Sequence, residues 1–444
     1  MGGAMKELAL YALEPGTGVD PETGLRTAEA DCAVNLIPFP LRRGSTLRPK
    51  TEGDRIKVYF YRPEVPGELI HTYAYQPEAN WTTYSPELSA LEWTDGEYTA
   101  PADGFVRVAV AGAVPGEAPE EGAALQDRVL TGEASCGEPP VPEWMTRCEE
   151  SLKQRVTACR REKDLLLFLL ADTHYTAGCI WPDTLRSLRL AAEELHPDAV
   201  VHLGDFTDGL LPTAYTRSIA AMVLADLRTV CGRLWCCVGN HDRNYFRGNP
   251  GAMSREECAR LYLDRETPWY HVDFPAQKLR LLFLDSFDPT EKERYGFPPE
   301  EVRWLRRRLL TTPRAYRVLV FSHVPPAAEI HVWSETIRNE ERMFRRLERF
   351  HARRGGAVLG WVHGHSHADQ IYEKRAFPVI GIGCAKLEDF PEHKPEGSVT
   401  YPREQHSQSQ ELWDALLIHA ETGSLDFLRF GAGEDRHVEM KREK

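Results

Sequence analysis

Hydrophobic residues beyond position 165 gather into short continuous runs that are separated by longer amphipathic stretches. The first three runs begin at Leu165, Ala199 and Leu234, and helical patterns at 183–195 and 214–230 lie between them. An uninterrupted apolar run is typical of a strand that is covered on both faces. Because strands and helices alternate along the chain, this part of the sequence predicts a layered α/β domain with parallel strands.

The same alternation continues through the rest of the chain. Further strands are expected within 279–286, 317–323 and 357–365, further helices within 300–310 and 335–354, and a hairpin within 413–430. The basic residues of 300–310 are expected to form a solvated helix face. The segment 386–410 has neither a helical nor a strand pattern, so we expect a long loop there, and loops of this length usually carry function.

The first 114 residues follow a different pattern. Ile56, Val58 and Phe60 recur at every second position, which is the period expected of a half-buried strand. Short strands and frequent turns predict a small β-sandwich at 1–114. Its segment 98–108, YTAPADGFVRV, resembles strands of carbohydrate-binding-like modules attached to surface enzymes. The many aromatic side chains either form the core of the sandwich or present a face that binds a glycan or cell-wall polymer.

The stretch between the two patterns predicts a connection. Residues 115–142 are rich in Gly, Glu and Pro, as linkers are, and a helical pattern follows at 143–161. We therefore expect a β-sandwich at 1–114, a linker with a connecting helix at 115–162, and the α/β domain at 163–435.

Composition narrows the classes of function. The 444 residues carry a formal net charge of −13, which argues against a broad nucleic-acid-binding face. No apolar run approaches the ~20 residues that a membrane-spanning helix needs. The first residues lack the long apolar region of a secretory signal, so we expect a cytoplasmic protein, with export by a route without a signal peptide as the alternative. The ten cysteines include no CxxC pair and are expected to be reduced thiols.

Side chains that can bind metal ions follow the ends of five apolar runs. They are Asp172 and His174, Asp205, Asn240 with His241 and Asp242, His323, and His365 with His367. Parallel strands deliver such residues to one edge of a sheet. Oxygen and imidazole ligands without thiolates suit Mn, Fe or Zn ions. The sequence therefore predicts a metal site at this edge.

The order of these motifs, Asp-x-His, Gly-Asp, Gly-Asn-His-Asp, His and Gly-His-x-His, resembles the calcineurin-like metallophosphoesterase superfamily over residues 165–430. The resemblance implies a four-layer α/β/β/α sandwich with a dinuclear metal centre. It implies that Asp172, His174 and His367 hold one metal ion, that Asn240, His323 and His365 hold the other, and that Asp205 bridges the two.

The resemblance also implies a mechanism. A hydroxide between the metal ions would attack the phosphorus of a phosphate ester, while His241 would bind a phosphoryl oxygen or protonate the leaving group. Asp242 would orient His241 or its loop. The expected function is metal-dependent hydrolysis of phosphomonoesters or phosphodiesters, with diesters slightly favoured. The alternatives are an inert surface-binding protein, and an enzyme that its N-terminal module brings to a glycan or cell-wall polymer.

Several neighbouring residues have a structural interpretation. Asp208 is expected to shape its loop, His363 to be structural, and His331 to have no ligand role because no partner stands at a suitable spacing. Segments between 283 and 326 resemble the branch that contains cyclic-nucleotide phosphodiesterases and purple-acid-phosphatase-like enzymes. In that branch another His commonly precedes the fourth-motif His, and Ser322 takes that place here.

Overall fold

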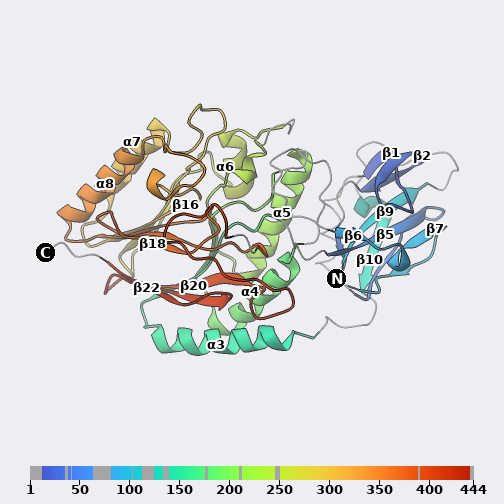
Figure 1. Cartoon of the computed structure of the whole chain (residues 1–444), viewed down its shortest axis with the longest axis horizontal. Coiled ribbons are helices and arrows are strands. Elements are labelled where there is room, and N and C mark those ends of the chain that lie inside the picture. Colours follow the sequence, from blue (N-terminus) through green and yellow to red (C-terminus); the bar gives the residue numbers. More distant parts are fainter. Residues whose placement is uncertain are drawn as a thin grey trace.

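The computed structural model describes most of the chain, and Figure 1 shows an all-strand part in blue and cyan beside a larger part in which helices flank strands. The described residues are 13–35, 39–41, 43–63, 82–102, 104–112, 125–133, 140–175, 179–209, 213–245, 251–388 and 391–440. Within these ranges no helix is long and apolar enough to cross a membrane. The cysteines in these ranges are all free thiols, as expected.

Two six-stranded sheets form the centre of the larger part. The first contains, in spatial order, β13 (Leu234–Cys236), β12 (Ala199–His202), β11 (Leu165–Leu170), β20 (Leu412–His419), β21 (Ser424–Gly431) and β22 (Arg436–Glu439). The second contains β14 (Tyr270–Phe274), β15 (Leu279–Phe283), β16 (Arg317–Ser322), β17 (Val358–His363), β19 (Val379–Gly381) and β18 (Gln370–Tyr372). Strands β11 to β13 are parallel, as are β15, β16, β17 and β19, so each set ends at one edge of its sheet.

Helices cover the outer face of each sheet. The first sheet is covered by α3 (Glu143–Cys159), α4 (Trp181–Leu195), α5 (Thr213–Val230) and α6 (Arg255–Leu263), and the second by α7 (Pro299–Thr311) and α8 (Glu340–Arg353). Successive residues of β11 point to opposite faces: Leu167 joins Leu281 in the core between the sheets, and Phe168 joins Leu188 in the core under the helices. The predicted four-layer α/β/β/α sandwich is confirmed.

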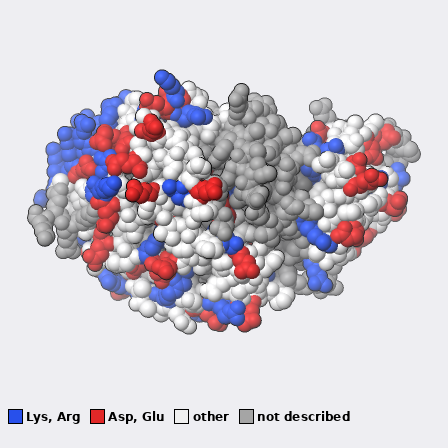
Figure 2. All heavy atoms as spheres, viewed as in Figure 1, with Lys and Arg blue, Asp and Glu red and all other residues white. Residues whose placement is uncertain are grey.

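Positive charge gathers on the outer layer of the second sheet. Figure 2 shows Lys and Arg side chains concentrated over α7 and α8. Arg303, Arg306 and Arg307 of α7 are exposed, as expected of a solvated helix face.

The N-terminal part consists of two antiparallel sheets, in agreement with the predicted all-β region. One contains β1 (Leu13–Val19), β2 (Arg26–Asn35), β9 (Gly104–Ala111), β5 (Arg55–Pro63) and β6 (Thr82–Tyr84), with β3 (Phe39–Leu41) and β7 (Ala90–Thr94) attached. The other contains β10 (Val129–Glu133), β4 (Ser45–Pro49) and β8 (Tyr98–Thr99). Tyr59, Tyr61 and Tyr98 are buried core residues. Three further aromatic residues lie outside the described ranges: Tyr73, Tyr75 and Trp81.

Part of the expected linker is folded. Strand β10 pairs with β4 along its whole length, and the helical turn α2 (Leu125–Arg128) precedes it. The linker prediction is therefore wrong for residues 125–133, because the side chains of Leu125 and Val129 are buried in a hydrophobic core despite the Gly- and Glu-rich sequence before them. The helix expected at 143–161 is present as α3, and it packs against β20 and β21 of the first sheet.

Candidate metal centre and active site

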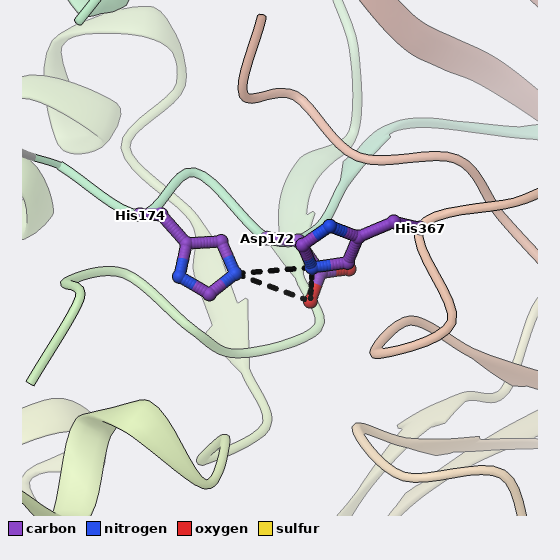
Figure 3. Close-up of side chains that lie close together, drawn as sticks. All are labelled: Asp172, His174 and His367. Atoms are coloured by element: carbon purple, nitrogen blue, oxygen red, sulfur yellow. Dashed lines mark hydrogen bonds and ion pairs between the residues drawn. The ribbon is translucent and has the colours of Figure 1, made fainter. Parts of the chain in front are cut away.

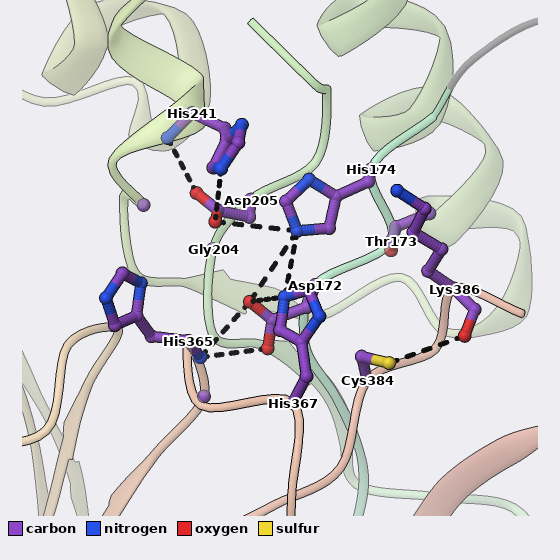
Figure 4. A network of polar contacts seen from close by, with 12 residues as sticks. Asp172, Thr173, His174, Gly204, Asp205, His241, His365, His367, Cys384 and Lys386 are labelled. Carbon is purple, nitrogen blue, oxygen red and sulfur yellow. Dashed lines mark hydrogen bonds and ion pairs between the residues drawn. The ribbon is translucent and has the colours of Figure 1, made fainter. Parts of the chain in front are cut away.

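The seven predicted metal ligands lie together at the edge where the parallel strands of both sheets end. They follow β11 (Asp172, His174), β12 (Asp205), β13 (Asn240), β16 (His323) and β17 (His365, His367), and Figure 4 shows most of them around a common centre. Five have left-handed backbone: Asp172, His174, Asp205, His365 and His367, with φ between 44° and 65°. Residues other than glycine adopt this conformation at a cost, and it is concentrated at functional sites.

Asp172, His174 and His367 form the first group of candidate ligands (Figure 3). Nε2 of His367 lies 3.1 Å from Nε2 of His174 and 3.4 Å from Oδ1 of Asp172. Nε2 of His174 lies 4.0 Å from the same Asp172 oxygen. The three donor atoms are close enough to share one metal ion.

Asp205, His323 and His365 form the second group, with Asn240 beside them. Nε2 of His323 lies 3.1 Å from Oδ2 of Asp205 and 3.0 Å from Oδ1 of Asn240. The side chains of Asp205, His323 and Asn240 are all buried.

Asp205 lies between the two groups. Its Oδ2 atom is 3.1 Å from Nε2 of His323 in the second group and 3.6 Å from Nε2 of His174 in the first. Its Oδ1 atom accepts a hydrogen bond from the backbone N–H of His241 at 2.8 Å. A carboxylate that faces both groups has the position required to bridge two cations.

The donor chemistry of the site fits metal ions. Nε2 of His365 is buried and has no hydrogen-bond partner among the described residues, and burial lowers the pKa of His365 well below its usual value, so the ring is neutral as a ligand must be. Burial alone would lower the pKa of His323, but the surrounding carboxylates of Asp205, Asp172 and Asp242 together raise it to about 9. The carboxylates of this centre therefore favour added positive charge, which two cations would supply.

The far nitrogens of the candidate ligands face fixed partners. Nδ1 of His323 lies 3.0 Å from the carbonyl oxygen of Leu203, and Nδ1 of His367 lies 3.0 Å from both carboxylate oxygens of Glu388. A partner at Nδ1 holds the proton there and leaves the Nε2 lone pair directed at the metal position.

Two carboxylates, Glu388 and Asp208, contact candidate ligands although neither was expected to do so. Glu388 is buried, and its Oε1 also lies 3.3 Å from Nζ of Lys394. Oδ1 of Asp208 lies 3.0 Å from Nδ1 of His174 and 3.9 Å from Nζ of Lys386. Both lie outside the motif order, Glu388 in the segment without a regular pattern, so only the tertiary fold reveals their proximity to the ligands.

His241 lies against Asp205 and His174. Its Nδ1 donates to the carbonyl oxygen of Asp208 at 2.7 Å, and its Nε2 is 3.9 Å from Oδ2 of Asp205. The ring is partly exposed, and burial is the main cause that lowers the pKa of His241 to about 4. Nε2 therefore faces the Asp205 carboxylate that lies between the two ligand groups.

Asp242, which was predicted to orient His241 or its loop, contacts the backbone of two neighbouring loops. Its carboxylate is buried and accepts hydrogen bonds from the backbone N–H groups of Gly239, Asp205 and Phe206 at 2.8–2.9 Å. Burial and then Asp205 raise the pKa of Asp242 to about 7. Asp242 thus fixes the loops after β12 and β13 against each other. Asp242 is therefore a positioning residue, and its contacts fit the expectation that it orients its loop.

The other weighed residues lie near the centre. His363 is buried in β17 with Nδ1 2.9 Å from the Gly364 carbonyl oxygen, as expected of a structural residue. Ser322 accepts a hydrogen bond from Trp361 Nε1 at 2.9 Å and donates one to the Val324 carbonyl.

Comparisons with known proteins place this site in a family. The family model described as calcineurin-like phosphoesterase matches residues 165–369. A probable cyclic nucleotide phosphodiesterase from Rhodococcus erythropolis is 28% identical over 235 residues, which are 49% of this chain and 70% of that protein. Residues 165–369 therefore belong to the calcineurin-like phosphoesterase family, and the chain is a phosphoric ester hydrolase.

Solved structures with a similar fold include two from eukaryotes. A dimetal phosphatase from Danio rerio has a TM-score of 0.46 and 16% identity, covering 62% of this chain and 99% of that one. The GAP50 anchor of the Plasmodium inner membrane complex has a TM-score of 0.44 and 12% identity, covering 63% of this chain and 90% of that one.

Proposed function

We propose that the chain hydrolyses phosphate diesters at a dinuclear metal centre. The observation that carries the proposal is the position of Asp205, whose Oδ2 faces His323 of one ligand group and His174 of the other. Asp172, His174 and His367 would hold one ion. Asn240, His323 and His365 would hold the second. The native metals stay a prediction, and the imidazole and oxygen donors favour Mn, Fe or Zn.

Bound metal ions would acidify water and offset the charge that develops on the phosphoryl oxygens. The contribution of the protein is to hold the donors in place and to supply a proton donor. Nδ1 of His241 is engaged by the Asp208 carbonyl, so the transferable proton must be carried at Nε2. Burial lowers the pKa of His241, and a negatively charged substrate beside the ring favours its protonated form.

The diester preference draws on the Rhodococcus erythropolis relative, whose name describes it as a probable cyclic nucleotide phosphodiesterase. The sequence identity of 28% between the two proteins supports phosphate-ester hydrolysis by both, and the experiment below distinguishes monoesters from diesters.

The test compares paired chromogenic esters. Protein loaded separately with Mn, Fe or Zn is assayed with bis(p-nitrophenyl) phosphate and with p-nitrophenyl phosphate, and the metal content of each sample is measured. We expect two ions per chain and a higher kcat/KM for the diester. A higher value for the monoester would overturn the diester preference. Absence of turnover on both esters with two ions bound would support the inert surface-binding alternative.

The N-terminal part and the location of the protein stay predictions. Binding to a glycan or cell-wall polymer would require exposed aromatic side chains, whereas Tyr59, Tyr61 and Tyr98 are buried. A glycan array with the full-length chain tests this role, and binding to none of the sugars would remove it. Fractionation of the source cells tests the expected cytoplasmic location.

A further inference from the structure

An exposed tryptophan stands beside the candidate metal centre. Trp333 lies in the segment between β16 and α8, and 39% of its surface is accessible. Its ring meets the ring of the candidate ligand His365 edge-on, with 4.7 Å between the ring centres. The other large hydrophobic side chains that are exposed in the described ranges are all aliphatic.

Two further rings, the buried His331 and the half-buried Tyr295, lie next to this tryptophan. His331 stacks on His365 with 5.2 Å between ring centres, and Tyr295 lies 4.4 Å from His331. The ring centre of His331 is 6.1 Å from that of Trp333. Tyr295, His331 and Trp333 therefore form a continuous aromatic wall beside His365, in which His331 is buried and Trp333 is exposed. The wall links His331, which had no expected role, to the site.

The exposed part of the Trp333 indole is accessible to a ligand at the metal centre. Full burial of a large aromatic side chain stabilises a protein, and here a large part of that gain is not realised. A flat apolar surface beside a phosphate-binding centre offers a stacking platform to a planar group that is attached to the phosphate. Stacking of a nucleobase on an aromatic side chain is tolerant of base identity because each base has a π-face.

We propose that Trp333 stacks against the base of a nucleoside phosphate ester, so that the substrate class of this enzyme is nucleotide-like. The inference rests on the proposed function, because it assumes that the phosphate group of the ligand binds at the metal centre next to His365. In this proposal the aromatic wall makes the enzyme bind nucleotide esters in preference to esters of simple alcohols and sugars.

The test uses two ligands that differ only in the base. AMP and ribose 5-phosphate are compared as competitive inhibitors of bis(p-nitrophenyl) phosphate hydrolysis by the Mn-loaded full-length chain. We expect AMP to bind about tenfold more tightly than ribose 5-phosphate, the size of effect that one base stacking on an aromatic ring produces. Trp333→Ala should weaken AMP to the level of ribose 5-phosphate, while Trp333→Phe should keep most of the preference.

The matched control is Val332→Ala, which trims the exposed neighbour in the same segment and should leave both inhibition constants unchanged. Equal binding of AMP and ribose 5-phosphate to the unchanged protein would overturn the inference, as would a preference that survives Trp333→Ala. Lack of ester hydrolysis with two ions bound would contradict the proposed function instead. In that case calorimetric titration of the metal-loaded protein with the same two ligands still decides the role of Trp333.

Discussion

Individual histidines at the centre are held by partners that face their far nitrogens. His367 faces the Glu388 carboxylate, and His323 faces the carbonyl of Leu203. The motif order allowed prediction of the ligands, because each follows directly from the end of an apolar run. Glu388 could not be predicted in the same way, since it comes from a segment without a periodic pattern and reaches the site only through the fold.

Replacement of His241 tests the assigned proton donor. His241→Ala should keep two metal ions and lose about 10²–10⁴-fold in kcat, the usual contribution of a positioned acid or base. Metal content by mass spectrometry and turnover of the chromogenic diester are measured on the same sample. Near-normal turnover by a protein with both ions would remove His241 from the mechanism.

Replacement of Glu388 tests whether it positions His367. Glu388→Gln keeps the shape and removes the charge, so we expect the affinity for one metal ion to fall about 10–100-fold, as for other partners of metal-binding histidines. Calorimetric titration of the metal-free protein gives this affinity. Glu392→Gln, which changes an exposed carboxylate in the same segment, is the control and should bind both ions normally. If both variants bind metal with unchanged affinity, Glu388 does not position His367 and serves only the structure of its loop.

Strands and helices were the part of the fold that hydrophobic periodicity predicted best. The runs that begin at Leu165, Ala199 and Leu234 are all strands, because continuous apolar segments need cover on both faces. Strand β10 was missed because its pairing partner β4 lies about 80 residues earlier in the chain, and the local sequence has linker composition.

Close approach of two loops requires glycine at position 239. A Cβ atom there would lie 2.0 Å from Oδ1 of Asp205, so Gly239→Ala should displace that carboxylate. We expect weaker metal binding and a loss of roughly 1–3 kcal/mol in stability from the overlap. Gly232→Ala is the matched control because nothing lies within 4 Å of its added Cβ, and its stability should change by less than about 0.5 kcal/mol. Equal urea midpoints for the two variants would contradict this account.

A buried charge cluster attaches the loop after β17 to the hairpin β20–β21. Arg429 lies 2.9 Å from Oδ1 of Asp414 and 2.6 Å from Oδ2 of Asp369, and Arg436 contacts both carboxylates. Burial alone would raise the pKa of Asp414, but Arg429 and Arg436 outweigh it and lower that pKa. The pairing therefore connects the two sheets behind the metal-binding loop.

The lowered pKa of Asp414 gives its stability contribution a defined pH dependence. The contribution is complete above the unfolded-state value of about 3.9 and is lost as the pH falls through the lower folded-state pKa. Unfolding midpoints in urea between pH 7 and pH 3 should therefore decline below about pH 4. Asp414→Asn should be less stable at pH 7 by about 3–5 kcal/mol, because the arginines lose a buried partner, and its decline below pH 4 should be smaller. Identical pH profiles would contradict the assignment.

The fold places the ends of the parallel strands of both sheets side by side. Each sheet supplies only part of the metal centre. The first sheet supplies Asp172, His174, Asp205 and Asn240, and the second supplies His323, His365 and His367. Sequence motifs predicted this convergence through the family resemblance, whereas the aromatic wall and the buried charge cluster depend on packing between distant segments.

The most direct test of the dinuclear centre is anomalous diffraction from crystals of the Mn-loaded protein at the Mn absorption edge. The account predicts two anomalous peaks per chain, one among Asp172, His174 and His367 and one among Asn240, His323 and His365, with the Asp205 carboxylate between them. A single peak, or two peaks elsewhere in the molecule, would contradict it.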